Sequence, residues 1–398
     1  MLTGVVTAKL LAVFVGPSGM ALMGNFRNFL ASLEAVATLG FTQGIVKYVA
    51  TYKNDPVKLS QWISTVLLFV LGLVLIAAMV LLSFRAQFNT YIFGDAFSFE
   101  FLFVVLAFVF PLQVLNGVFI AIINGLERYK TVIYIQIIGN VLGFALTVFL
   151  MYYWTLNGAL LALILAPAAT GICSYLWIHK DIKFDPKAWN IQFLKPLFSY
   201  SAMALFSAVV APLTFFYIRL HIISSQGMDE AGYWEALLRI STFYMTFVVT
   251  LISVYFLPKL AQTNSTAEIR PFIKQYCLWV LPVFGIGMVL FYFCRTWLIK
   301  LLLDDQFLPV SDLMFWQLIG DFLKAFSLIY GILFYAKRLV VPYLITEALS
   351  FGIFYLSSIF FIDRFGTEGA TMAHSFTYLI YSLVLVAYFE GYYRRKNS

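Results

Sequence analysis

The chain has 398 residues and a net charge of +7; 62% of its residues are hydrophobic and only 11% are charged. Soluble globular domains carry roughly 25% charged residues, so this composition excludes a soluble fold. The cations lie in short links between apolar runs, which argues against a nucleic-acid partner and indicates a membrane protein.

Apolar runs of about 20 residues recur along the whole chain, and a helix of that length crosses a hydrocarbon layer roughly 30 Å thick. A membrane barrel would instead show segments of about ten residues in which apolar and polar side chains alternate. We therefore predict an all-α polytopic membrane protein with about 12 transmembrane helices. The predicted spans lie near residues 1–15, 22–46, 61–83, 100–124, 131–152, 158–178, 197–218, 232–257, 272–293, 313–335, 341–362 and 368–389.

The first predicted span, Met1 to Val15, is too short to cross a bilayer at about 1.5 Å per residue. It ends in Gly16-Pro17-Ser18-Gly19 and leads directly into further apolar sequence, which is not the pattern of a cleavable signal peptide. Either the first helix is truncated or it enters the membrane only partway, and we favour truncation because the orientation of the later spans is regular.

A polar link from His179 to Lys195 separates the first six spans from the last six. This division predicts two six-helix lobes, residues 1–190 and 191–398, as expected for the internal repeats common in transporters.

The cations also predict the orientation of the chain. Most of them fall in the even-numbered links and at the C-terminus: Lys47, Lys53, Lys58, Arg128, Lys130, Lys180, Lys183, Lys187, Lys195, Lys259, Arg270, Lys274, Lys337, Arg338, Arg394, Arg395 and Lys396. The odd-numbered links hold only Arg85, Arg219, Arg295, Lys300 and Arg364. Because Lys and Arg are enriched on the cytoplasmic side, we predict that both termini are cytoplasmic.

Charged residues inside the spans are candidate functional residues, because a charge near the bilayer centre costs at least about 2.5 kcal/mol. They are Lys9, Arg27, Glu34, Glu235, Arg239, Asp321, Lys324 and Glu347. Their spacing places Arg27 with Glu34, Glu235 with Arg239, and Asp321 with Lys324 on shared helix faces. One interpretation is a polar cavity in which the cations Lys9, Arg27, Arg239 and Lys324 bind an anionic group. The alternative is that these residues form internal ion pairs that fix helix packing. A further alternative for Arg27 is that its side chain snorkels to the membrane interface.

The sequence has no GxxxxGK[ST] motif for binding ATP, so we predict that transport is either passive or coupled to an ion gradient. Asp321, Glu347 and Glu34 are the candidates to carry a coupling proton, since a low-dielectric cavity disfavours the charged form of a carboxyl group. We predict no metal site and no cofactor, because the three histidines and three cysteines show no metal-ligand spacing. His374, inside the last span, is interpreted as an interior residue with satisfied hydrogen bonds.

The links between spans are short, and the first outer link contains no acidic residue. They offer no evident outer site for glycosyl transfer, so we predict that the chain is not an enzyme.

Several stretches together resemble a known family. They are Lys9-Leu10-Leu11-Ala12-Val13 with Gly16-Pro17, Gly24-Asn25-Phe26-Arg27, Gly44-Ile45-Val46-Lys47-Tyr48-Val49-Ala50, Ser253-Val254-Tyr255-Phe256-Leu257-Pro258, and Trp316-Gln317-Leu318-Ile319-Gly320-Asp321-Phe322-Leu323-Lys324. In this order the chain resembles the Wzx-type polysaccharide flippases, which handle O-antigen or the lipid III of enterobacterial common antigen. They belong to the multidrug/oligosaccharidyl-lipid/polysaccharide exporter superfamily. Family members normally have more residues before the position of Met1.

The resemblance implies a flippase that moves an undecaprenyl-pyrophosphate-linked oligosaccharide from the cytoplasmic to the periplasmic leaflet by alternating access. It implies that Lys9, Arg27 and Lys324 bind the pyrophosphate. It also implies that Asn25, Asn28, Gln43 and Gln317 accommodate the glycan. A multidrug antiporter and a membrane enzyme of glycan assembly are the rival readings. Expected partners are the lipid-linked substrate, membrane lipid and membrane proteins that polymerise glycan or regulate its chain length, at the bacterial inner membrane.

Overall fold

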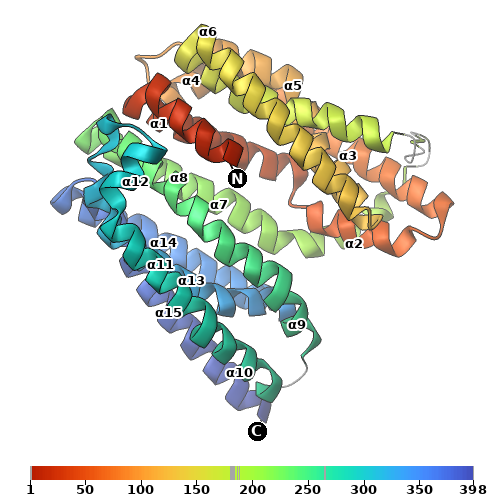
Figure 1. Cartoon of the computed structure of the whole chain (residues 1–398). Coiled ribbons are helices and arrows are strands. Elements are labelled where there is room, and N and C mark those ends of the chain that lie inside the picture. Colours follow the sequence, from red (N-terminus) through yellow and green to blue (C-terminus); the bar gives the residue numbers. More distant parts are fainter. Residues whose placement is uncertain (1, 180–183, 186, 188, 264–265, 398) are drawn as a thin grey trace. The chain divides into compact units, whose positions relative to one another are not determined.

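A computed structural model describes residues 2–179, 184–185, 187, 189–263 and 266–397. Every regular element in these ranges is a helix (Figure 1). Within the described residues, ten continuous helical segments are long and apolar enough to cross a membrane, and some of them, such as Glu268–Phe293, join several shorter elements. The prediction of an all-α polytopic membrane protein is therefore confirmed.

The elements of the first half are α1 (Leu2–Thr38), α2 (Thr42–Tyr52), α3 (Pro56–Ser83), α4 (Arg85–Phe93), α5 (Glu100–Gly125), α6 (Tyr129–Ile178) and η2 (Ile191–Phe193). Those of the second half are α7 (Lys195–Gln226), α8 (Met228–Leu251), η3 (Ile252–Phe256), α9 (Leu257–Gln262), α10 (Thr266–Gln275), η4 (Tyr276–Val280), α11 (Leu281–Phe293), α12 (Arg295–Leu302), η5 (Asp305–Phe307), α13 (Val310–Lys337), α14 (Val340–Phe365) and α15 (Glu368–Asn397).

Two of the long helices contain a sharp break, and each therefore holds two of the predicted spans. α1 breaks at Gly16, which has φ 70° and ψ −176° and is followed by Pro17. α6 has 50 residues and breaks at Thr155, which has φ 43° and ψ −116°. These breaks explain how ten long helices accommodate about twelve predicted spans.

The second predicted span, residues 22–46, is interrupted in the structure. α1 ends at Thr38, and α2 begins at Thr42. Between them the backbone of Gly40 has φ 66°, and a Cβ at this position would lie 3.0 Å from the backbone nitrogen of Leu205 in α7. Glycine is needed here for both its conformation and its small size.

The start of α3 shows how a local signal sets a helix boundary. Asp55 precedes the helix, and its carboxylate accepts a hydrogen bond of 3.1 Å from the backbone nitrogen of Lys58. Pro56 occupies the first helical position, where its missing N–H costs nothing. The hydrogen bond from Lys58 holds the pKa of Asp55 below its ordinary value.

The chain divides into two compact units. The N-terminal unit contains Leu2–Val15 and Leu22–Leu213, and the C-terminal unit contains Gly16–Ala21 and the chain from Thr214 onward. The division falls inside α7, whereas the sequence analysis placed the lobe boundary at residue 190. The two six-helix lobes remain a prediction.

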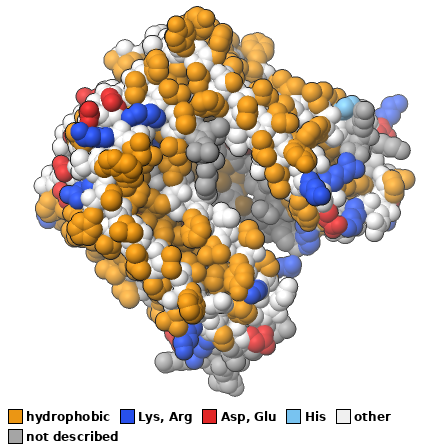
Figure 2. Space-filling model, in the orientation of Figure 1, with side chains coloured by type: hydrophobic (Ala, Val, Ile, Leu, Met, Phe, Trp, Pro, Cys, Tyr) orange, Lys and Arg blue, Asp and Glu red, His pale blue; other side chains and the backbone are white. Residues whose placement is uncertain are grey.

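Each unit has its own helix packing. In the N-terminal unit α5 packs against α2, α3 and α6. In the C-terminal unit α13 packs against α8, α11 and α15, and α15 packs against α14. Large hydrophobic side chains such as Phe108 and Phe293 stay more than 70% exposed. Hydrophobic side chains cover most of the face seen in Figure 2. Such a surface suits contact with lipid tails.

Candidate functional site

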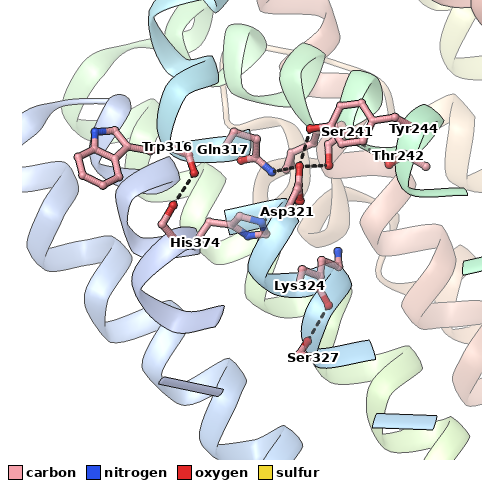
Figure 3. A network of polar contacts seen from close by, with 11 residues as sticks. Ser241, Thr242, Tyr244, Trp316, Gln317, Asp321, Lys324, Ser327 and His374 are labelled. Atoms are coloured by element: carbon pink, nitrogen blue, oxygen red, sulfur yellow. Dashed lines mark hydrogen bonds and ion pairs between the residues drawn. The ribbon is translucent and has the colours of Figure 1, made fainter. Parts of the chain in front are cut away.

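Among the charged side chains whose burial the structure describes in the C-terminal unit, the carboxylate of Asp321 on α13 is the most buried, at 0% exposed. Its Oδ2 accepts hydrogen bonds from Ser241 Oγ at 2.7 Å, Tyr244 OH at 2.6 Å and Gln317 Nε2 at 3.1 Å. His374 Nε2 lies 3.0 Å from Oδ1. Figure 3 shows these side chains converging on Asp321 from α8, α13 and α15. One carboxylate therefore links three helices.

Helical spacing brings these donors together. Gln317 and Asp321 are four residues apart on α13, and Ser241 and Tyr244 are three apart on α8, so each pair lies on one face of its helix. Gly320 lets α15 approach, because a Cβ there would lie 2.3 Å from Cδ2 of His374. The interpretation of His374 as a satisfied interior residue is confirmed.

A cavity of about 170 Å³ lies next to this network inside the C-terminal unit. We call it the tyrosine cavity. Its charged and phenolic lining residues are Lys324, Tyr335, Tyr343, Glu347, Tyr378 and Tyr381. They come from α13, α14 and α15.

The polar groups of the tyrosine cavity contact one another. Tyr381 OH donates a hydrogen bond of 2.8 Å to Glu347 Oε1. The hydroxyl groups of Tyr335 and Tyr343 lie 2.9 Å apart. The ammonium group of Lys324 lies 5.6 Å from the centre of the Tyr378 ring, which is within cation–π range. The cavity thus combines one cation, one carboxyl group and phenol hydroxyls.

A second buried charge cluster joins α7 to α8. Arg219, 1% exposed, places Nη2 2.5 Å from Oε2 of Glu235, and Arg239 Nε lies 3.3 Å from Oε1 of the same residue. The guanidinium group of Arg219 also lies 5.4 Å from the ring centre of Trp234. The predicted pairing of Glu235 with Arg239 is confirmed.

Sequence reasoning missed Arg219 because it ended the seventh span at residue 218 and assigned Arg219 to an outer link. In the structure α7 continues to Gln226, which places Arg219 inside the helix. The apolar residues Leu220, Ile222 and Ile223, which follow it, were the available signal. A charged residue followed by more apolar sequence belongs to the span when a partner can neutralise it.

The predicted pair of Asp321 with Lys324 takes a different form. The ion pair that the structure shows for Asp321 is with His374, provided that His374 is protonated. Lys324 instead lines the tyrosine cavity with Glu347. Gln317, predicted to contact glycan, is 1% exposed and donates to Asp321.

The remaining predicted residues lie on α1 in the N-terminal unit. Asn25 is 1% exposed, and its amide donates a hydrogen bond of 3.1 Å to the carbonyl of Ile92 at the end of α4. Lys9 and Arg27 are partly buried, as is Asn28, while Glu34 is exposed. The side chain of Gln43 lies outside the described part of the chain. Because these residues and the tyrosine cavity belong to different units, the shared cavity remains a prediction.

No group of three or more His, Cys, Asp or Glu residues that could hold a metal ion occurs among the residues the structure describes. The tyrosine cavity places a cation, a carboxyl group and hydroxyl donors inside the apolar helix bundle of the C-terminal unit. These groups can bind an anionic or hydroxyl-rich ligand by charge-assisted hydrogen bonds.

The fold and this charged interior define a multi-pass helical membrane protein with a transporter architecture. The fold is similar to that of an inward-facing multidrug resistance MATE family transporter of the MOP superfamily, with a TM-score of 0.78 and 13% identity over 99% of this chain and 95% of that one. It is also similar to the lipid II flippase MurJ in an inward closed conformation, with a TM-score of 0.76 and 17% identity over 98% of this chain and 85% of that one.

The chain belongs to the polysaccharide biosynthesis protein family, whose model matches residues 1–264. It is 28% identical to the lipid III flippase of Escherichia coli (strain K12) and to that of Shigella flexneri, over 98% of this chain and 95% of theirs. It is 22% identical to a putative O-antigen transporter of Shigella flexneri, over 94% of this chain and 90% of that protein.

Proposed function

We propose that this protein is a flippase that moves an undecaprenyl-pyrophosphate-linked oligosaccharide from the cytoplasmic to the periplasmic leaflet by alternating access. Its product would serve the synthesis of a cell-surface polysaccharide. The observation that carries the proposal is the end-to-end similarity to lipid III flippases, which covers 98% of this chain. The physical need is clear, because a sugar hydroxyl group moved into hydrocarbon without a partner costs several kcal/mol.

On this proposal the pyrophosphate is bound by the cations of the membrane interior. Lys324 is the strongest candidate, because it lines a cavity with hydroxyl donors. Lys9, Arg27 and Arg239 are the further candidates, and Asn25 contributes by positioning α1 through its bond to Ile92. Phosphate oxygens accept charge-assisted hydrogen bonds from such groups.

A multidrug antiporter is the weaker alternative. A site for cationic drugs needs an excess of carboxylates, whereas the charged cluster of Arg219, Glu235 and Arg239 carries more cations than anions. A membrane enzyme of glycan assembly is weaker still, because the full-length relatives carry the names of flippases and transporters.

The proposal includes a location and an orientation. The protein would lie in the bacterial inner membrane with both termini in the cytoplasm, since most of its cations fall in the links on that side. Glycan polymerases and chain-length regulators of the same membrane would be its partners.

Complementation of a strain that lacks its own oligosaccharide flippase tests the proposal. Wild-type protein should restore surface polysaccharide, whereas Lys324→Ala and Arg27→Ala should lower the rate about tenfold or more. Each change removes a charge-assisted hydrogen bond worth about 1.5–3 kcal/mol. The measurement is the lipid-linked oligosaccharide that accumulates in the membrane, at equal expression.

Two matched controls use exposed ion pairs. Lys300→Ala breaks a pair with Asp305, and Arg85→Ala breaks a pair with Glu100. The side chains of both pairs are between 44% and 74% exposed, and exposed ion pairs contribute little to stability, so both controls should complement normally. Normal rescue by Lys324→Ala and Arg27→Ala as well would remove the proposed site. Failure of the wild-type protein with several lipid-linked glycans would remove the proposed function.

A further inference from the structure

We infer that Glu347 is a proton-responsive switch that controls how strongly Lys324 binds an anionic group in the tyrosine cavity. This inference rests on the proposed function and deepens it, because it names the residue that makes pyrophosphate binding depend on pH. Both side chains line the same cavity of about 170 Å³ inside the C-terminal unit.

Glu347 is better placed than Asp321 to take up a proton. Asp321 has no exposed surface; Ser241, Tyr244 and Gln317 donate to its Oδ2, and His374 Nε2 lies 3.0 Å from its Oδ1, so both of its oxygens already have partners. Glu347 is partly exposed and borders a cavity with room for several water molecules. A proton can reach Glu347 through this water, whereas a proton on Asp321 would have to displace a donor.

The cavity around Glu347 is lined by α8, η3, α13, α14 and α15, and its titratable groups come from the last three. From α13 these are Lys324 and Tyr335, from α15 Tyr378 and Tyr381, and from α14 itself Tyr343. α8 and η3 contribute Val249, Ile252 and Ser253, none of which titrates. The pair Asp321 and His374 lies about one helical turn before Lys324 and Tyr378 on α13 and α15. The ring centroids of His374 and Tyr378 are 4.8 Å apart. Among the lining residues, the charged side chains are Lys324 and Glu347.

Charge balance gives the direction of the effect. When Glu347 is ionised, its charge offsets that of Lys324, and an incoming anion meets a carboxylate in the same cavity. When Glu347 is protonated, the cavity carries the charge of Lys324 without that offset and attracts an anion more strongly. Proton binding and anion binding therefore favour each other, and this linkage is reciprocal.

The experiment measures binding of farnesyl diphosphate, a short isoprenoid pyrophosphate, to the purified 398-residue protein in detergent. Isothermal titration from about pH 8 to about pH 5 covers the range in which a carboxyl group in such a cavity titrates. Relative to Glu347→Gln, whose pH dependence reports the titration of the probe alone, the affinity of wild-type protein should rise at least about tenfold as the pH falls. Lys324→Gln should bind weakly at every pH.

Two further variants keep the test independent of folding defects in Glu347→Gln. Tyr381→Phe removes one hydroxyl donor from Glu347 and leaves the ring in place, so the transition should move to higher pH because the ionised carboxylate loses a donor. Glu390→Gln is the matched control, since Glu390 is exposed on α15 and pairs with Arg270. It should behave as wild type. The probe's own titration is common to all variants, so the differences between them isolate Glu347.

The outcomes separate this inference from the proposed function. If Glu347→Gln keeps the wild-type pH dependence, or the transition of Tyr381→Phe does not move, the switch is overturned while pyrophosphate binding stands. If wild-type protein binds no probe at any pH, the proposed pyrophosphate ligand is overturned and the switch with it.

Discussion

At the scale of single residues, Asp321 shows how a carboxylate is kept inside a membrane helix bundle. Removing a charge from water costs several kcal/mol unless hydrogen bonds replace the lost solvent. Four side chains from three helices supply this replacement, and each approaches within 3.1 Å. The charge of Asp321 thus becomes a point at which α8, α13 and α15 are held together.

Asp321→Asn should therefore destabilise the protein. An amide is neutral and has only one acceptor oxygen, so Ser241, Tyr244 and Gln317 would no longer donate to a charged group, and His374 could face the new NH₂ group only as an acceptor. The expected loss is about 2–4 kcal/mol of stability, since a hydrogen bond to a charged group contributes about 1.5–3 kcal/mol and a neutral one about 0.5–1.5 kcal/mol. Thermal unfolding of the purified protein in detergent measures the change as a lowered melting temperature.

Asp312→Asn is the control for this substitution, because Asp312 is exposed in the first turn of the same helix. Its melting temperature should equal that of the wild type within error. An equal melting temperature for Asp321→Asn would show that the four hydrogen bonds do not stabilise the fold.

The sequence identifies Asp321 and Lys324 as candidates because a charge in an apolar run is unusual, but it does not identify their partners. Ser241, Tyr244 and His374 are ordinary residues for their helices. Their approach to Asp321 depends on the register in which α8 and α15 pack against α13, which no local pattern specifies. The pairing of Glu235 with Arg239 was predictable, since both residues lie on one helix four positions apart.

At the scale of elements, the two breaks inside α1 and α6 differ in their chemistry. Gly16 adopts a positive φ without cost, because glycine has no Cβ. Thr155 adopts φ 43° with a β-branched side chain, which strains the backbone. The length of an apolar run predicts each span, but the direction in which the chain leaves a span depends on such single residues.

Thr155→Gly should stabilise the protein by about 1 kcal/mol, because glycine populates this backbone conformation as readily as a negative φ. The measurement is again the melting temperature in detergent, which should rise. Thr147→Gly in the same helix provides a control of opposite sign. Thr147 lies in regular helix and its hydroxyl donates to the carbonyl of Gly143 at 2.7 Å, so its replacement should lower the melting temperature. A decrease for both variants would argue against strain at Thr155.

At the scale of the whole molecule, the distribution of cations along the chain makes a prediction that the fold alone does not make. The links rich in Lys and Arg alternate with links that are poor in them, and this alternation assigns sides to the membrane. Arg219 was counted in an outer link, and its burial in α7 removes one cation from that side. The correction strengthens the asymmetry.

The native cysteines allow this orientation to be tested. Cys294 is exposed between α11 and α12, beside Arg295 in an odd-numbered link, so we expect it to face the periplasm. A membrane-impermeant maleimide added to intact inner-membrane spheroplasts should label it. Cys294→Ser should abolish most of the label, because Cys173 and Cys277 are only partly exposed.

An engineered cysteine tests the opposite side of the membrane. Lys58 is exposed at the start of α3 in an even-numbered link, so Lys58→Cys in a Cys294→Ser background should react only after the membrane is permeabilised. The C-terminus should then lie on the same side as Lys58, since an even number of predicted spans separates the two. Labelling of residue 58 in intact spheroplasts, with protection of Cys294, would invert the orientation. The Lys and Arg residues of the even-numbered links would then lie outside the cytoplasm, contrary to the usual enrichment of these residues in short cytoplasmic loops.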